Sequence, residues 1–132
     1  IFGGHRPMYI NSDYSGNEES DVTVSQDLVD NIEQMLYDNN VNVAFWGHNH
    51  VVQRQTAVKN YEVVQASTVV IDSDGNEVHH HDDPQATVHM VVGTGGARFT
   101  VNYVTPYPSW CEMVFYKYGY ARVEAVNVSN RF

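Results

Sequence analysis

The chain has 132 residues, which is one domain's length or less and is enough to bury a hydrophobic core. Its formal net charge is −9 with only seven Lys and Arg residues, which argues against nucleic acid or an anionic membrane as a partner. Hydrophobic residues make up 42% of the chain, yet no apolar run approaches the roughly 20 residues that a membrane span needs.

The first residues are typical of a buried strand that ends at a histidine. Residues 1–5 form a short apolar, glycine-rich run that closes at His5, and Pro7 then turns the chain. Because this start has neither Met nor a polar lead-in, we expect Ile1 to lie inside a longer protein. Residues 10–22 are rich in Asn, Ser, Asp, Glu and Gly, a composition that predicts an exposed loop.

A helix and a second strand are predicted next. Thr23 and Gln26 have the spacing of a capping box at the start of a helix. Apolar residues then recur on one helical face, namely Val24, Leu28, Ile32, Met35 and Leu36. We expect the helix to end near residues 39–40. Residues 41–46 are an apolar run short enough to be a buried parallel strand, so the whole segment predicts a β-α-β unit.

This second strand leads into two more histidines, because residues 46–50 are Trp-Gly-His-Asn-His. Side chains at i and i+2 of an extended backbone point to the same side, and a neutral imidazole is a common ligand of zinc, iron and manganese. Such a pair is a weak pattern alone, but His5 ends the other strand of the β-α-β unit. Since ligands bind beyond the carboxyl ends of parallel strands, we expect His5, His48 and His50 to converge on metal.

Beyond Arg54 the sequence favours strands and turns. Residues 61–65 and 67–71 are rich in strand-forming residues, and residues 72–76 carry a turn pattern. Three consecutive histidines at 79–81 precede two aspartates and a proline. This polar composition predicts a solvated loop rather than a physiological metal site.

The last third of the chain predicts a buried strand, a turn and a hairpin. Residues 88–93 have the apolar character of a buried strand. Residues 93–96 are glycine-rich but lack the lysine of a phosphate-binding loop, so a tight turn is expected. Residues 113–118 and 120–127 alternate well enough to predict a terminal hairpin around Gly119.

The two histidine motifs, in this order and with a helix between them, resemble the purple acid phosphatases, which are calcineurin-like metallophosphoesterases. The matching motifs are Gly-His-Arg-Pro-Met-Tyr at residues 4–9 and Gly-His-Asn-His at residues 47–50. Residues 88–96 resemble the family's late core strand and glycine turn, and residues 118–123 resemble its closing hairpin. The resemblance covers almost the whole chain except residues 57–86.

The resemblance implies an α/β fold, in which residues 1–132 form part of a four-layer αββα metallophosphoesterase sandwich. The family's earlier motifs supply a bridging Asp, the Tyr that gives the purple colour and an Asn-His pair. They lie before the segment that corresponds to His5, where this chain has not yet begun. We therefore expect the chain to be the C-terminal part of one catalytic domain, to have the missing N-terminal half as its partner, and to be inactive alone.

The resemblance also implies a binuclear centre of Fe(III) with Zn, Mn or Fe(II). In the family pattern His5 and His48 ligate the divalent ion, and His50 ligates the ferric ion. Tyr9 either reaches the substrate phosphate or packs in the core, and Glu18 either faces the substrate or belongs to a solvated acidic loop. Plant-type members carry histidines in this loop that help to hold substrate, and this chain has none there.

The function implied is that of an acid phosphatase, which hydrolyses small phosphomonoesters by a metal-bridging hydroxide in the full-length protein. Two alternatives stay open, a phosphodiesterase or nucleotidase of the same fold and a non-catalytic extracellular module derived from it. Asn127 begins an acceptable glycosylation sequence, which fits a secreted or a lysosomal or vacuolar glycoprotein. The single Cys111 supports no internal disulfide.

Overall fold

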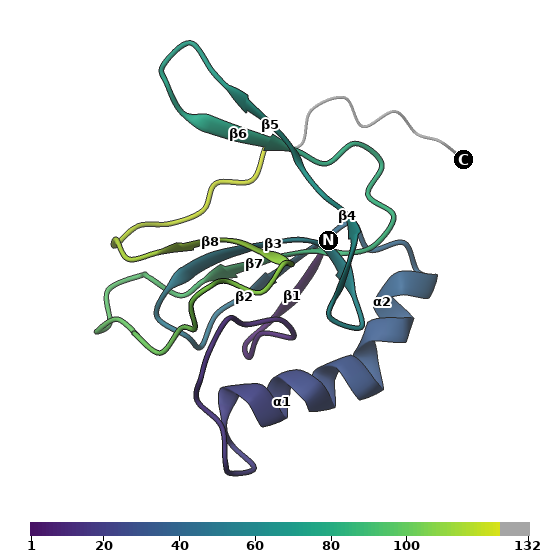
Figure 1. The fold of residues 1–132 in the computed structure, drawn as a ribbon, viewed down its shortest axis with the longest axis vertical. Coiled ribbons are helices and arrows are strands. Elements are labelled where there is room, and N and C mark those ends of the chain that lie inside the picture. Colours follow the sequence, from purple (N-terminus) through teal and green to yellow (C-terminus); the bar gives the residue numbers. More distant parts are fainter. Residues whose placement is uncertain (125–132) are drawn as a thin grey trace.

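A computed structural model describes residues 1–124 and shows a mixed sheet with helices on one face (Figure 1). The helical segment consists of α1 (Asp21–Leu28), the π-helical turn η1 (Val29–Glu33) and α2 (Gln34–Asp38). The strands of the main sheet are β1 (Phe2–Gly4), β2 (Val43–Trp46), β3 (Val52–Lys59), β4 (Glu62–Gln65), β7 (Val88–Val92) and β8 (Cys111–Phe115). A separate hairpin is formed by β5 (Thr68–Ile71) and β6 (Glu77–His80).

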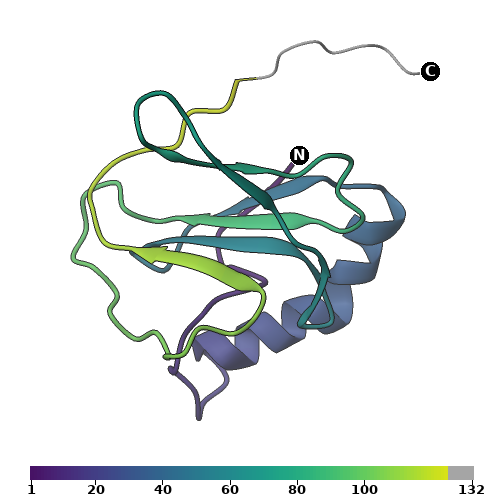
Figure 2. The same cartoon turned by 45° about the horizontal axis from the view of Figure 1, so that its top comes forward.

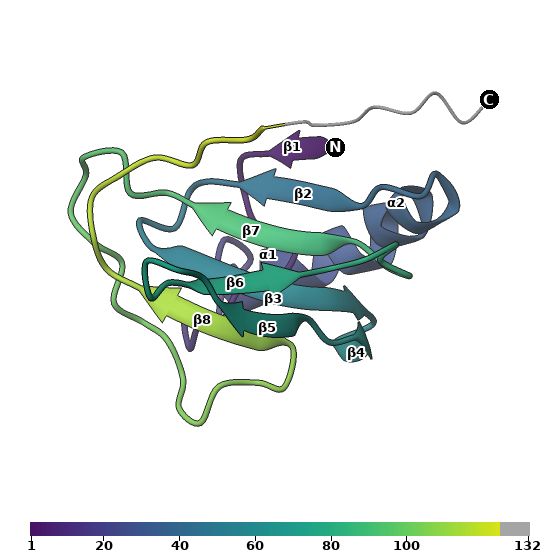
Figure 3. The same cartoon turned by 90° about the horizontal axis from the view of Figure 1, so that it is seen from above.

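The order of strands in the main sheet is β1-β2-β7-β3-β4, and β8 also pairs with β3 (Figure 3). Strands β1, β2 and β7 are parallel, whereas β3 is antiparallel to β7, β4 and β8. The register places Gly4 beside Trp46, so β1 and β2 end at the same edge of the sheet. This confirms the predicted β-α-β unit and the mixed α/β class, and it brings the two histidine motifs together.

The helix starts two residues before the predicted capping box. Ser20 is the N-cap, and its hydroxyl accepts a hydrogen bond from the backbone N–H of Thr23, so the box predicted at Thr23 and Gln26 is wrong. The predicted loop is also shorter than expected. Only its central part, residues 13–19, is exposed, because residues 10–12 fold under the sheet and are buried.

The helical face that meets the core is only partly the predicted one, since Leu28, Ile32 and Leu36 pack in the core but Met35 does not. The π-helical turn η1 interrupts the α-helical repeat before Met35. A π-turn has more residues than an α-turn, so it changes which later side chains face the sheet. The fully buried positions of the whole helical segment are Asp21, Ser25, Val29, Glu33 and Leu36. Met35 was expected on this face but is 52% exposed. Across residues 1–124, no helix is long and apolar enough to cross a membrane.

Between the helix and the sheet lies a core that combines aliphatic and aromatic side chains with buried polar groups. Its largest members include Met8, Tyr9, Leu36, Trp46, Val51, Val58 and Val91. The hydroxyl of the completely buried Tyr9 donates a hydrogen bond to the carboxylate of Glu33, and this carboxylate also accepts from the backbone of Asn60. Burial, reinforced by the nearby Glu33, raises the pKa of Tyr9.

The triple-histidine segment is not the solvated loop that its composition predicts, because His79 and His80 lie on β6. The ring of His79 faces a partly buried cluster. Its Nδ1 lies 2.8 Å from the Ser67 hydroxyl, its Nε2 accepts from Arg54, and the Nε of Arg54 donates to Glu112 at 3.1 Å. These partners stabilise His79 against the main sheet and tether the hairpin, which projects above it (Figures 1 and 2). The predicted turn at residues 72–76 is confirmed.

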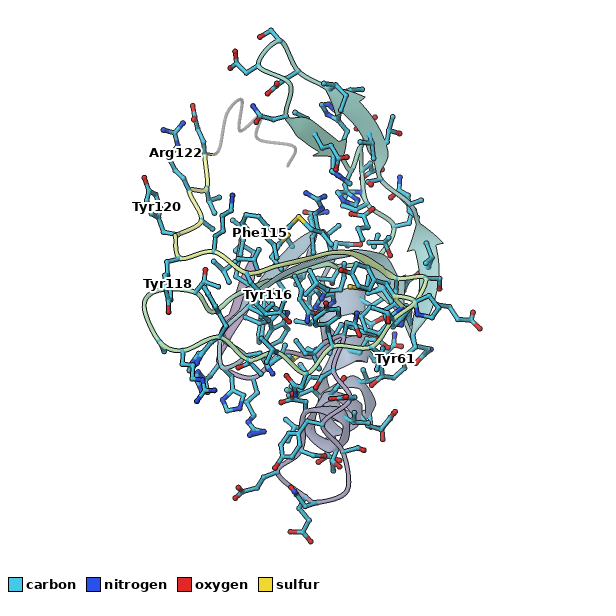
Figure 4. All side chains as sticks on the ribbon, turned by 60° about the vertical axis from the view of Figure 1, so that its left-hand side comes forward. Tyr61, Phe115, Tyr116, Tyr118, Tyr120 and Arg122 are labelled. Carbon is cyan, nitrogen blue, oxygen red and sulfur yellow. The ribbon has the colours of Figure 1, made fainter. Side chains whose placement is uncertain are left out.

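The predicted terminal hairpin around Gly119 is wrong over the residues that the structure describes. Strand β8 ends at Phe115, and residues 116–124 continue without strand pairing. The backbone N–H of Gly119 bonds instead to the carbonyl of Thr94, which ties this segment to the turn after β7. Figure 4 shows Tyr118, Tyr120 and Arg122 projecting outward from it. Residues 125–127 of the predicted hairpin lie outside the described residues.

Replacing Glu112 by Ala should loosen the β5–β6 hairpin, because Glu112 accepts hydrogen bonds from Arg54 on β3 and from Ser67 beside β5. We expect a protease specific for acidic residues to cleave within residues 72–77 several-fold faster than in the wild type. Mass spectrometry of timed digests measures this rate. The matched control is Glu62→Ala, which removes an exposed carboxylate from β4. Equal cleavage rates in Glu112→Ala and the control would show that the cluster does not hold the hairpin.

Candidate functional site

The structure brings His5 and His48 together at the shared edge of β1 and β2. The backbone N–H of Gly47 donates to the carbonyl of His5 at 3.0 Å, which continues the parallel pairing past the strand ends. The Nε2 of His5 then lies 3.1 Å from the Nδ1 of His48. The two rings meet edge to face, with their centroids 5.0 Å apart. Two imidazoles that the chain separates by more than forty residues are thus neighbours.

This pair fits the nitrogen ligands of a single metal ion. Two nitrogens that each lie about 2.0–2.1 Å from one tetrahedral zinc are about 3.3 Å apart. This is close to the 3.1 Å between the Nε2 of His5 and the Nδ1 of His48. Burial, then the charges of Arg6 and His5, lowers the pKa of His48. A lowered pKa favours the neutral ring, which keeps a lone pair for a metal.

His50 lies in the same loop but is held by a different partner. Its Nδ1 lies 2.8 Å from the backbone carbonyl of Arg98. Since a carbonyl only accepts, the Nδ1 of His50 carries the proton and its Nε2 retains a lone pair. Metal-binding histidines commonly have this arrangement, in which a backbone carbonyl fixes the tautomer and the orientation of the ring.

The expected three-histidine group is not formed by residues 1–124 alone. No three His, Cys, Asp or Glu side chains in that part of the chain are grouped so that they could hold one metal ion. The physical reason is the separate anchoring of His50 by Arg98, whereas His5 and His48 contact each other. The described residues therefore offer a two-nitrogen site and one further oriented imidazole.

The backbone of residues 47–51, hereafter the histidine loop, is strained. His48 has a φ of +58°, a left-handed conformation that is uncommon for a residue other than glycine. The N–H of Asn49 bonds to the carbonyl of Gly47 at 2.7 Å, and that of Val51 to the carbonyl of Asn49 at 2.8 Å. Two three-residue turns therefore follow each other, and such strain persists only where the surroundings fix it.

Two neighbouring segments hold the histidine loop from the side of β7. The N–H of His50 donates to the Thr100 hydroxyl at 3.0 Å, and the N–H of Thr100 donates back to the carbonyl of His50 at 3.1 Å. Gly93 allows the end of β7 to press against the loop, because a Cβ there would lie 1.9 Å from the carbonyl oxygen of Asn49.

A buried carboxylate holds the histidine loop from beneath. One oxygen of Asp21 accepts hydrogen bonds from Ser12 at 2.6 Å, Asn49 at 2.8 Å and Asn102 at 3.0 Å. Sequence reasoning did not find Asp21, Asn102, Thr100 or Arg98, because no spacing in the sequence links them to the histidine motifs. The only usable signal was the glycine that follows the buried strand β7.

The expected substrate and glycosylation residues have different outcomes. Tyr9 was expected either to reach the substrate phosphate or to pack in the core. In the structure it packs in the core, with its hydroxyl bonded to Glu33. Glu18 is exposed in residues 13–19, as in a solvated acidic loop. Asn127 lies outside the described residues.

Comparison with known proteins extends the likeness beyond the histidine motifs. A family model described as "Iron/zinc purple acid phosphatase-like protein C" matches residues 86–130. Acid phosphatase type 7 of Danio rerio is 27% identical over 94% of this chain, and acid phosphatase type 7 of Homo sapiens is 29% identical over 94% of it. The chain is thus similar to acid phosphatase type 7 proteins over most of its length and to purple acid phosphatases. It spans only 28% and 27% of the length of these two relatives.

Another purple acid phosphatase relative is similar over a shorter segment. The Arabidopsis thaliana protein named "Probable inactive purple acid phosphatase 9" is 39% identical over 60 residues, which are 46% of this chain and 9% of that protein. The relatives of this chain thus include proteins named as acid phosphatases and one named as probably inactive.

Replacing Gly93 by Ala should displace the histidine loop, because the added methyl group would collide with the carbonyl of Asn49. We expect a loss of about 1–3 kcal/mol in the free energy of unfolding of the full-length protein, measured by denaturant titration. Gly95→Ala is the matched control, since a Cβ at Gly95 meets no described atom within 4 Å. A Gly93→Ala protein as stable as the control would contradict the close approach of β7 to the loop.

Proposed function

We propose that this chain is the C-terminal part of the catalytic domain of an acid phosphatase that hydrolyses phosphomonoesters. The observation that carries the proposal is the His5–His48 pair, with nitrogens 3.1 Å apart at the carboxyl ends of two parallel strands. The matching family model and the names of the relatives support this class of reaction. The reaction requires the full-length protein, because the chain corresponds to little more than a quarter of those relatives.

In this proposal the three histidines have separate roles at a binuclear centre of Fe(III) with Zn, Mn or Fe(II). His5 and His48 would hold the divalent ion, and His50 would hold the ferric ion with the ring orientation that Arg98 imposes. When bound, such a centre neutralises the charge of the phosphoryl group and lowers the pKa of water so that it can attack. The remaining ligands would come from the N-terminal half.

The same N-terminal half is the proposed partner of the sheet face that the helices do not cover. An apolar groove on this face is lined by Val52, Met90, Val92, Met113 and Phe115, together with residues 117–121. Phe115 is 41% exposed, so the groove presents apolar side chains to solvent in the chain alone. Packing of a second sheet against this groove would complete the four-layer sandwich.

We further propose that the full-length protein is secreted or is delivered to the lysosome or vacuole. The acceptable glycosylation sequence at Asn127 and the acid phosphatase names of the relatives support this location. The proposed substrate class is that of small phosphate esters, and phosphodiesters or nucleotides are the alternative within the same fold.

A non-catalytic module is the second candidate function, and two observations favour it. The relative with 39% identity carries an inactive name, and its similarity extends over 60 residues. In addition, residues 11–20 lack the histidines that hold substrate in plant-type members. Metal content separates the two candidates, since an acid phosphatase of this type needs its ions and a module does not.

In the full-length protein, His48→Ala and His50→Ala should each abolish the hydrolysis of an aryl phosphate at acidic pH. Each change removes a proposed metal ligand, so metal content should fall together with kcat. His80→Ala is the control, because His80 is exposed on β6 and should leave both quantities unchanged. Full metal content and wild-type turnover in the His48 and His50 variants would place the site elsewhere, and a wild type without metal favours the non-catalytic module.

Residues 1–132 expressed alone should lack a stable monomeric fold, because the apolar groove beside Val52 and Phe115 stays uncovered. We expect self-association in analytical ultracentrifugation and a broad thermal transition in calorimetry. Addition of the separately expressed N-terminal half should sharpen the transition. A monomer with a sharp, cooperative transition would count against the proposed partner surface.

A further inference from the structure

We propose that Asp21 is the positioning residue of the histidine loop, since its buried carboxylate holds Asn49 and thereby fixes His48 and His50 on either side. The inference rests on the proposed metal-dependent function. It assigns a role to a residue that carries no metal itself and that lies at the start of α1, away from both histidine motifs in the sequence.

The three central side chains of the histidine loop point in different directions. Asn49 is only 3% exposed, whereas His48 and His50 on either side of it are partly exposed. The amide nitrogen of Asn49 donates to Asp21 at 2.8 Å, and its amide oxygen is buried with no hydrogen-bond partner in the described part of the chain. Among residues 1–124, the bond to Asp21 is thus the one polar contact that holds the Asn49 side chain.

The backbone of the histidine loop is strained on both sides of Asn49. A left-handed φ at His48 and two successive three-residue turns need an anchor that outweighs their cost. Asn49 belongs to both turns, as the donor of the first and the acceptor of the second. Fixing this one residue from inside therefore fixes the backbone that carries both imidazoles. Metal ligands need such support, because a site that is loose by about 1 Å loses its function.

Asp21 also bonds to side chains from two other loops. Ser12 lies in the loop after β1, Asn49 in the loop after β2, and Asn102 in the loop after β7. The carboxylate of Asp21 thus joins three loops at the edge of the sheet where His5 and His48 meet. Asp21 is itself only 6% exposed, so solvent does not readily replace a donor that is removed.

The test uses the full-length protein and three variants. Asp21→Ala removes the carboxylate and all of its hydrogen bonds. Asn49→Ala removes only the bond between Asp21 and the histidine loop, and leaves the Asp21 bonds to Ser12 and Asn102 in place. Ser25→Ala is the matched control, because Ser25 is buried on the same helix but bonds to Met8 instead.

The first readout needs no metal and no activity. In the metal-free protein, the amides of Asn49 and Val51 should exchange with solvent about tenfold faster in Asp21→Ala and Asn49→Ala than in the wild type. The second readout is the dissociation constant for zinc alone, which should rise about tenfold in the same two variants. Ser25→Ala should change neither value, even if its melting temperature falls.

The inference is overturned if the amides of the histidine loop exchange at the wild-type rate in Asn49→Ala, or if Ser25→Ala loses zinc affinity to the same extent. If Asp21→Ala does not fold, Asn49→Ala still decides the question. A wild-type protein that binds no zinc overturns the proposed function and the ligand-holding role together. A zinc-binding wild type with unchanged variants overturns this inference alone.

Discussion

The parallel pairing of β1 with β2 is the constraint on which the candidate site depends. It sets Gly4 beside Trp46, and the next residues on each strand lead into His5 and His48. Neither strand is long, so the pairing continues into the loops through the bond from Gly47 to His5. The helical segment makes this arrangement possible, since two parallel strands need a crossover of this length between them. The chemistry at the sheet edge is therefore a consequence of backbone pairing.

The sequence predicted those parts that follow from short-range patterns. The β-α-β unit, the buried strand β7 and the turn at residues 72–76 are visible as periodicity and turn composition. The helix start was less accurate, because the cap is Ser20 and not Thr23. Met35 was wrongly assigned to the core, because the π-turn at Val29–Glu33 alters the helical repeat. His79 was misjudged for another reason, since its partners Arg54 and Glu112 come from distant strands.

The candidate site shows the same division between local and distant information. The motifs around His5 and His48 were evident in the sequence, and so was their meeting at one sheet edge. The anchoring of His50 by Arg98 was not, because a backbone carbonyl has no sequence pattern of its own. Asp21 was missed because the polar composition of residues 10–22 predicted an exposed loop, which would leave its carboxylate in solvent. Only the folded chain shows that its carboxylate faces inward.

The Asp21 network has a consequence for the order in which the chain can fold. Its three hydrogen bonds join residues that are 9, 28 and 81 positions apart. Contacts with large sequence separation form late, since closing a long loop costs more entropy than closing a short one. During synthesis the bond to Ser12 can form first and the bond to Asn49 next, while the bond to Asn102 must wait for β7 and the loop beyond it. The histidine loop is thus completed by one of the last segments of the described chain to leave the ribosome.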